Sequence, residues 1–387
     1  RDVSGTLRAG GRIGWLRWSS PTLAVEVQDA RIGWQFAALL QREVRLGEVR
    51  AAQVTLTPLG SDPDAQPAEP LAQLTLPVRV ALPFHVDRIT WAAENPTHID
   101  GLEGSYHYDG DQHRLAIDSV TLAQGQYALQ ATLQGRAPMA LDATVQGDLR
   151  TPVPGGAQEL RARAEARAQG TLATRDARLQ INAHLRGEGD EPMRADAQAR
   201  IAPWAPQPLL EASAELQALD LAALWPQAPA TQLSGSAQAQ PEGEGGWRIA
   251  ADLRNARPGP WDKKQLPLDA LQARAAFDGA TWTVPEATLR LGPGSVAAQG
   301  AYTPGTQALQ GRVQVQALNP ASVHTALDAA PINGTASAQG QEGGPVRFSA
   351  DLRAAGTPRR ANALRIERLA AEGTWQGAHI DIARLDL

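Results

Sequence analysis

The chain of 387 residues contains no cysteine, which excludes a disulfide framework, cysteine-based zinc sites and thiol catalysis. Aromatic residues are scarce, at 5%, so a core built from large aromatic side chains is not expected. No apolar run approaches the roughly 18–20 residues that span a bilayer. The net charge is only −5 and there is no basic block, so nucleic acid is not an expected partner.

The motifs of common catalytic sites are also absent. The sequence has no G-x-S-x-G, HExxH or P-loop pattern. The glycines of "GRIGWLRW" lack the succession of strand, glycine loop and helix that binds phosphate, and "GPGS" at 292–295 is typical of a turn. We therefore expect neither an enzyme nor a bound cofactor.

Four histidines, His85, His98, His107 and His113, lie close together in the sequence. Histidine is a common zinc ligand. However, His107 and His113 flank the Asp-Gly pair at 109–110, a turn where solvated polar residues are expected in any case. We therefore expect a solvated hairpin here and no metal site.

Alternation of apolar and polar residues is the dominant pattern. In "YALQATLQG" (127–135) the apolar side chains fall on one parity and the glutamines and Thr132 on the other. The stretches "ARLQINAHLRG" (177–187) and "VRFSADLR" (346–353) alternate in the same way. A period of two is typical of strands with one dry face and one wet face.

In one stretch the helix propensity of the residues and the alternation of apolar and polar residues favour different structures. "ELRARAEARAQGTL" (159–172) is rich in Ala, Glu and Arg, which favour helix. Its leucine and alanines nevertheless share one parity and its charges the other, so the pattern predicts a strand. We predict strands for 193–201 and 208–216 as well.

Four short stretches are candidates for helices. The weakest is 208–216, for which we prefer a strand. The others are 34–41, 220–225 with Asp220 as N-cap, and 319–327 with Asn319 as N-cap and Pro320 as first helical residue. The Pro-rich and acidic stretch 60–70 is expected to be a disordered loop. It divides an N-terminal β segment, 1–59, from a continuous repetitive β region, 71–387.

The β region contains an internal repeat. "ALDLAALWPQAPATQLSGSAQAQ" at 218–240 corresponds to "ALNPASVHTALDAAPINGTASAQ" at 317–339, 99 positions later. The same offset carries on through 257 and 356, where "ADLR" recurs. Repeats of amphipathic hairpins imply a solenoid-like or elongated curled sheet, and we interpret the repeat as a structural period.

So few helices cannot cover the apolar faces of so many strands. Three all-β solutions remain: a sandwich of two sheets, a barrel or closed solenoid, and an open trough whose dry lining contacts acyl chains. The candidate lining residues would otherwise form an ordinary closed core. They are Val25, Val27, Leu129, Leu133, Val145, Ile181, Leu185, Leu253, Val313, Val315, Phe348 and Leu352.

Tryptophan is the commonest aromatic residue, with ten Trp against four Phe. Trp15, Trp18, Trp91 and Trp282 are among those that fall near expected strand ends or helices. Core packing is the interpretation we favour, and capping of a trough or anchoring of Trp15 and Trp18 at a membrane interface are the alternatives.

The N-terminal stretch resembles the TamB family. The resemblance rests on "V-x-G-T-L" at 3–7, "RIGWLRW" at 12–18, the passage through Trp34 and Leu39-Leu40, and "LTLPVRVALPFHVDRITW" at 74–91. The repeated "ALDLAALWP…LSGSAQAQ" unit is similar to the middle region of that family. The resemblance covers nearly the whole chain, by the order of elements more than by any single motif.

The resemblance implies an elongated β-taco, a curled repetitive sheet with a hydrophobic groove and a few short helices. It implies a periplasmic location in a diderm bacterium, anchoring in the inner membrane, and phospholipid transport that supports outer-membrane biogenesis. The family acts with the outer-membrane barrel TamA. The N-terminal anchor and the C-terminal region that contacts TamA are absent here, so we expect a segment of a larger protein.

Two functions of different classes follow from this resemblance. In the first, phospholipid acyl chains move along the groove between the two membranes. In the second, open sheet edges assist the assembly of outer-membrane β-barrel proteins by strand addition, as a structural or chaperone-like factor.

Overall fold

The structure is a computed structural model. It describes residues 2–6, 10–34, 43–59, 69–70, 72–93, 96–122, 125–152, 159–188, 192–205, 207–224, 228–243, 245–341, 343–356, 367–376 and 379–386. The helix expected at 34–41 lies outside the described residues except for Trp34, which ends a strand. Most of the loop predicted at 60–70 lies outside them as well.

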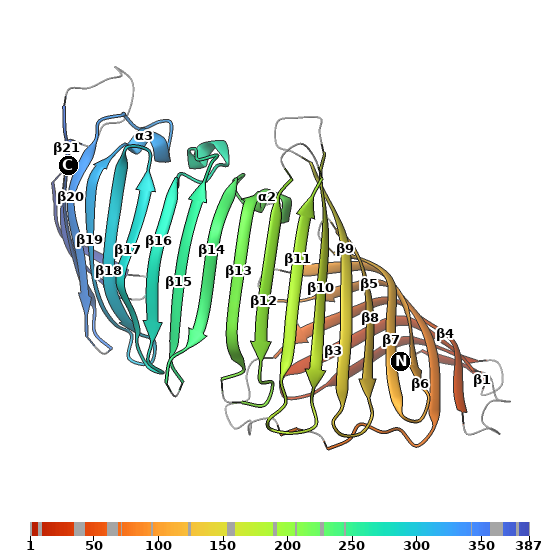
Figure 1. Cartoon of the computed structure of the whole chain (residues 1–387). Helices are drawn as coiled ribbons and strands as arrows, with labels where there is room; N and C mark the ends of the chain where they lie inside the picture. Colours follow the sequence, from red (N-terminus) through yellow and green to blue (C-terminus); the bar gives the residue numbers. More distant parts are fainter. Residues whose placement is uncertain are drawn as a thin grey trace. The chain divides into compact units, whose positions relative to one another are not determined.

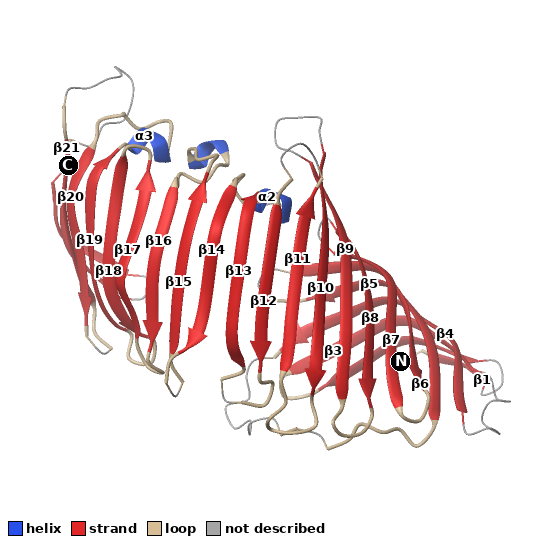
Figure 2. Ribbon diagram, viewed as in Figure 1, coloured by secondary structure: helices blue, strands red, loops and turns tan. Residues whose placement is uncertain are grey.

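The protein is nearly all β, with 71% of residues in strands and 3% in helices. The 23 strands form one open, curled sheet (Figures 1 and 2), which confirms the predicted fold class and excludes a closed barrel. The described helices are α2 (Leu221–Leu224), α3 (Pro320–Val323) and the single 3-10 turn η1 (Trp261–Lys263). The strands form two compact units.

Unit 1 comprises residues 1–188 and 198–209. Its strands are β1 (Val3–Thr6), β2 (Gly10–Ser19), β3 (Leu23–Trp34), β4 (Glu43–Pro58), β5 (Arg79–Trp91), β6 (Thr97–Tyr108), β7 (Gln112–Leu122), β8 (Gly125–Gln134), β9 (Ala140–Pro152), β10 (Glu159–Thr171) and β11 (Leu179–Gly187). Each strand pairs with the next in the chain, and strand β10 confirms that pattern outweighs helix propensity at 159–172.

The pair β4–β5 is parallel, whereas the other strand pairs described above for unit 1 are antiparallel. Parallel neighbours need a crossover connection, because the chain must return to the edge from which the first strand started. The described end of this crossover lies against the connection between β8 and β9. Leu74 N–H donates to Gly135 O at 2.7 Å, and Gln73 forms a bridge with Arg136.

Unit 2 comprises residues 189–197 and 210–387. Its strands are β13 (Leu209–Leu219), β14 (Leu233–Pro241), β15 (Trp247–Asn255), β16 (Ala270–Phe277), β17 (Trp282–Leu291), β18 (Gly294–Thr303), β19 (Ala308–Leu318), β20 (Ile332–Gly340), β21 (Val346–Ala354), β22 (Arg368–Gln376) and β23 (His379–Asp386). They pair antiparallel in chain order, and β12 (Arg194–Ile201) is divided between the two units. The strands predicted at 193–201 and 208–216 are thus confirmed.

The same irregularity occurs twice in unit 2, 99 positions apart. A β-bulge interrupts the pairing at Leu216/Leu219 and again at Val315/Leu318. Inside the bulges Ala218 and Ala317 have φ of 49° and 48°, a left-handed conformation that is unusual for alanine. Each backbone N–H donates to a side chain of the next strand, to Ser234 Oγ at 2.9 Å and to Asn333 Oδ1 at 2.8 Å.

A helix follows each bulge, and its N-cap is the one predicted from the sequence. Ala222 N–H donates to Asp220 Oδ1 at 3.1 Å, and Ala321 N–H donates to Asn319 Oδ1 at 3.1 Å. These bonds satisfy donors that the first turn of a helix leaves without a partner. Both helices are only four residues long, shorter than the predicted stretches.

The equivalent glycines Gly235 and Gly334 stand opposite Leu253 and Leu352 and have φ of +136° and +151°. A Cβ at either position would lie well inside contact distance of a backbone oxygen on the next strand, that of Asp252 or Asp351. Only glycine allows the strands to approach this closely at these positions.

Gly334→Ala is therefore expected to lower the free energy of unfolding by about 1–3 kcal/mol through strain and displacement of the neighbouring strand. Gly305→Ala is the matched control, because a Cβ there meets nothing within 4 Å. The control should change stability by less than about 0.5 kcal/mol. Urea denaturation followed by circular dichroism measures both, and equal effects would contradict the assignment.

Candidate functional site

The candidate site is one face of the sheet, built by cross-strand register. Residues directly opposite each other on neighbouring strands point to the same side. The pairing of unit 2 therefore sorts its side chains into rows that run across the strands. The face that carries the apolar rows is called the apolar face, and the opposite one the polar face.

The first row, the leucine row, crosses unit 2 from β13 to β22. At about 4.8 Å per strand it is about 43 Å long. Every member is apolar or glycine: Leu216, Gly235, Leu253, Leu271, Leu289, Val296, Val315, Gly334, Leu352 and Leu369.

The second row, the alanine row, lies two residues further along each strand. Its short side chains leave an even surface with no bulky projection except at Val313. Its members are Ala214, Ala237, Ala251, Ala273, Ala287, Ala298, Val313, Ala336, Ala350 and Ala371.

A third row, the aromatic row, lies at the other end of the strands. Trp247, Phe277, Trp282 and Tyr302 stand opposite one another on β15 to β18. The rings of Phe277 and Trp282 stack with centroids 4.8 Å apart. Trp247 is six residues from Leu253, so the aromatic and leucine rows are about 20 Å apart along the strand.

Unit 1 has an apolar face of the same kind. One row crosses it through Leu16, Val27, Val54, Ile89, Ile99, Leu122, Gly125, Leu149 and Ala162. Beside this row, the ring of Tyr127 lies over Gly125 and Gly147, where any Cβ would meet it. Burial under this packing raises the pKa of the Tyr127 hydroxyl.

All twelve residues predicted to line a groove lie on the apolar face of their unit. The structure brings Leu129 and Val145 directly opposite each other in unit 1. In unit 2 it places Leu253, Val315 and Leu352 in the leucine row, Val313 in the alanine row and Phe348 nearer the turns.

The apolar face is not enclosed in a closed core. Of the twelve residues only Leu185 and Val315 are buried, Val145 is exposed, and the other nine are partly exposed. The accessible surface of the chain is 24121 Å², whereas a compact monomer of 41.1 kDa exposes about 15,000 Å². Apolar side chains that remain accessible over such an area are typical of a surface that binds an apolar partner.

Full burial in unit 2 is concentrated at one edge of its sheet. Three connections, called the rim segments, lie there with the short helices: 220–232, 256–269 and 319–331, the first described apart from 225–227 (Figures 1 and 2). Beneath them Leu219, Leu233 and Ile332 are 5–6% exposed. The rim segments thus supply the packed core that the open face lacks.

The rim segments are tied to the sheet and to one another by hydrogen bonds. The buried Thr231 hydroxyl donates to Leu219 O at 3.0 Å and accepts from Leu221 N–H at 2.9 Å. Ala230 N–H donates to Lys264 O at 2.8 Å, which links the first segment to the second. The second is linked to the third by Thr325, described below.

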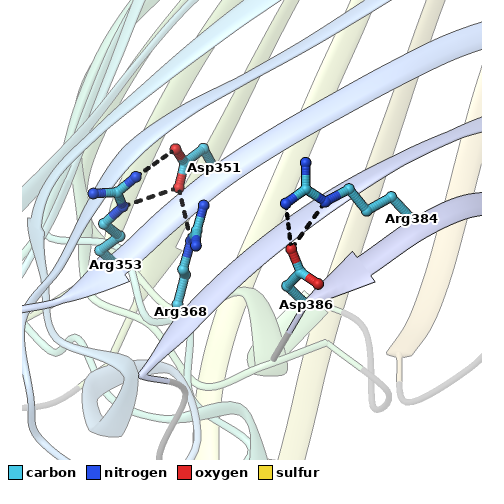
Figure 3. A network of polar contacts seen from close by, with 5 residues as sticks. All are labelled: Asp351, Arg353, Arg368, Arg384 and Asp386. Atoms are coloured by element: carbon cyan, nitrogen blue, oxygen red, sulfur yellow. Dashed lines mark hydrogen bonds and ion pairs between the residues drawn. The ribbon is translucent and has the colours of Figure 1, made fainter.

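The polar face carries ion pairs in place of apolar rows. Figure 3 shows two such groups. Asp351 accepts hydrogen bonds from Arg353 at 3.1 and 3.2 Å, and Arg368 Nε lies 3.8 Å from its carboxylate. Arg384 donates to Asp386 at 2.7 and 2.9 Å. The hydrogen bond from Arg353 is the largest effect on the Asp351 carboxyl, and it lowers the pKa. Desolvation opposes this shift, whereas the charges of the neighbouring arginines lower the pKa further.

Clefts of about 290, 500 and 580 Å³ in unit 2 are lined largely by polar-face residues, among them Asp252, Arg274 and Glu286. Their mixed charges and long side chains make them gaps in a solvated surface. The apolar face is therefore the better candidate for a site, because its rows of apolar side chains continue without interruption across the described strands of the unit.

His113 contradicts the prediction of a solvated hairpin, since it is only 7% exposed. Its Nε2 donates to Leu74 O at 2.7 Å, so Nδ1 accepts from the Tyr106 hydroxyl at 2.6 Å. Its ring stacks on Tyr108 at 4.4 Å. The prediction was wrong because β7 turns His113 toward the apolar face and the crossover from β4 covers it.

Comparison with family models, curated proteins and solved structures found no match for this chain. Within the described residues, no helix has the length and apolar character required to cross a membrane. The same residues hold no group of three or more His, Asp or Glu placed to bind a metal ion. The choice of the apolar face as the candidate site is therefore based on its geometry.

Sequence reasoning missed the aromatic row. Its members are far apart in sequence and meet only through strand pairing. A usable signal was present, because Trp247, Phe277, Trp282 and Tyr302 each lie beside a glycine-containing turn or strand end. Aromatic residues that repeatedly flank turns on the same edge must meet across the hairpins.

Arg353→Gln is expected to raise the pKa of the Asp351 carboxyl toward its ordinary value, because it removes the hydrogen bond that lowers it most. The favourable contribution of Asp351 is present at neutral pH and is lost as pH falls through the lowered pKa. NMR titration of ¹³C-labelled aspartate measures the change. Arg312→Gln, elsewhere on the polar face, is the control and should leave Asp351 unchanged.

Proposed function

We propose that the protein conducts phospholipids, with acyl chains held on the apolar face and headgroups in water. The observation that carries this proposal is the leucine and alanine rows, which stay apolar across ten strands on a partly exposed face. An acyl chain is the natural occupant of such a surface, because it is long, apolar and without directional contacts.

The energetics suit movement better than tight binding. Each buried CH₂ contributes about 0.8 kcal/mol whatever its position along the row. The alanine row offers nearly the same surface at every strand, so a chain shifted by one strand spacing loses little contact. At the turn edge, tryptophan and tyrosine combine an apolar ring with a polar tip, which suits the boundary between acyl chain and headgroup.

The cellular setting follows from the resemblance to the TamB family. We propose a periplasmic segment of a protein anchored in the inner membrane, acting between the two membranes of a diderm bacterium. A partner barrel such as TamA would bind a region outside this chain. An open conduit alone moves lipid only down a gradient, so direction requires a source outside this segment.

Purified protein is expected to carry phospholipid, detected by mass spectrometry of its organic extract. Phe348→Glu should lower the lipid content several-fold, because it places a charge on the apolar face. Ser349→Glu is the matched control, since the adjacent side chain lies on the polar face. Absence of lipid from wild-type protein that also cannot be loaded would refute the conduit.

A neutral probe tests the same face without adding charge. p-Benzoylphenylalanine at position 313 should crosslink to acyl chains on irradiation, whereas the same probe at position 314 should not. Val313 belongs to the alanine row and Gln314 to the polar face. Equal crosslinking at the two positions would show that lipid does not distinguish the faces.

The exposed isoleucines of β23 favour a second function, assembly of β-barrel proteins by strand addition. Ile380 and Ile382 are 62% and 53% exposed. A strand with such side chains can pair with a strand of another protein. If this is the function, removal of β23 should abolish binding of peptides with barrel-strand sequence, whereas Phe348→Glu should leave it intact.

A further inference from the structure

The η1 turn in the second rim segment has an unusual composition. Lys263 and Lys264 are the only lysines in the chain, which otherwise uses arginine as its cation. They follow Trp261, whose exposed fraction is 54%. Arg257, at the start of the same segment, is also exposed.

The backbone of this turn is rigidly held. Lys263 N–H donates to Pro260 O at 3.0 Å, and Lys264 N–H donates to Trp261 O at 2.8 Å. Gly259 N–H donates to Leu266 O at 3.2 Å. The Trp261, Lys263 and Lys264 side chains are therefore exposed on an ordered support, so little ordering entropy opposes their use in binding.

The acidic residue of the turn is engaged elsewhere. Asp262 accepts from Thr325 N–H at 2.9 Å and from the Thr325 hydroxyl at 2.5 Å, and its side chain is 21% exposed. The side chain of Lys263 is 63% exposed, with Nζ 4.0 Å from the Asp262 carboxylate. The carboxylate thus points to Thr325 in the third rim segment, while the cationic side chains are exposed to solvent.

We propose that this turn, formed by Arg257, Trp261, Lys263 and Lys264, docks on the surface of an anionic phospholipid bilayer. Its charge complements anionic headgroups, and tryptophan prefers the interface between headgroups and acyl chains. Lysine suits this role because its long apolar stem reaches into the interface while the ammonium stays among the headgroups. The contact does not depend on lipid conduction along the apolar face.

Co-sedimentation with vesicles of phosphatidylglycerol and phosphatidylcholine tests the docking. Wild-type protein should bind the anionic vesicles, release as salt increases, and bind pure phosphatidylcholine weakly. Lys263→Gln with Lys264→Gln should reduce partition about 30-fold, at about 1 kcal/mol for each lysine near a charged surface. Trp261→Ala should weaken binding in the same assay.

A matched control is available on another surface. Arg290→Gln with Arg312→Gln removes two exposed cations from the polar face. This control should not change partition. Partition that is unaffected by the lysine pair, or reduced equally by the arginine pair, would overturn the proposal.

Amine footprinting gives a readout that needs no substitution. An acylating reagent can modify only Lys263, Lys264 and the N-terminal amine, because the chain has no other lysine. Anionic vesicles should protect the two lysines, whereas a short-chain monomeric phosphatidylglycerol or an acidic peptide should not. Protection by either soluble competitor at equal charge would assign the turn to a different ligand and refute bilayer docking.

Discussion

Cross-strand register is the constraint on which the rest of the structure depends. Because side chains alternate along a strand and opposite residues share a face, one apolar parity per strand becomes a continuous surface across a unit. A slip of one residue would send Leu253 and its row to the polar face and Asp252 to the apolar face. The bulges at Leu216/Leu219 and Val315/Leu318 are compatible with this register, because they lie at the strand ends, beyond the leucine row.

In unit 2 the packed residues under the rim segments lie apart from the accessible face that is proposed to bind lipid. The buried leucines and isoleucine lie under the rim segments, where Thr231 and its hydrogen bonds hold the connections on the sheet. The short side chains of the alanine row bury little apolar area, and they leave an even surface for the proposed acyl chains. A second layer on this face would have increased burial, but it would have removed the accessible surface on which the proposed conduit depends.

Local chemistry was predictable from the sequence, and long-range pairing was not. Strand β10 and the caps Asp220 and Asn319 followed from parity and capping preference, which act over a few residues. The faces of the twelve candidate residues followed from parity as well. The burial of His113 depends on a crossover from β4, and the aromatic row depends on pairing between strands, so neither was visible along the chain.

The number of strands between the two short helices has a consequence for the evolution of the sheet. From α2 to α3 the chain passes through six strands, β14 to β19. An even number of antiparallel strands returns the chain to the edge from which it left, and equivalent residues 99 positions apart face the apolar side. Duplication or loss of this segment in the gene would therefore change the length of the sheet while keeping its helical edge, its turn edge and both faces in place. The sheet can therefore be lengthened or shortened in evolution by whole copies of this segment.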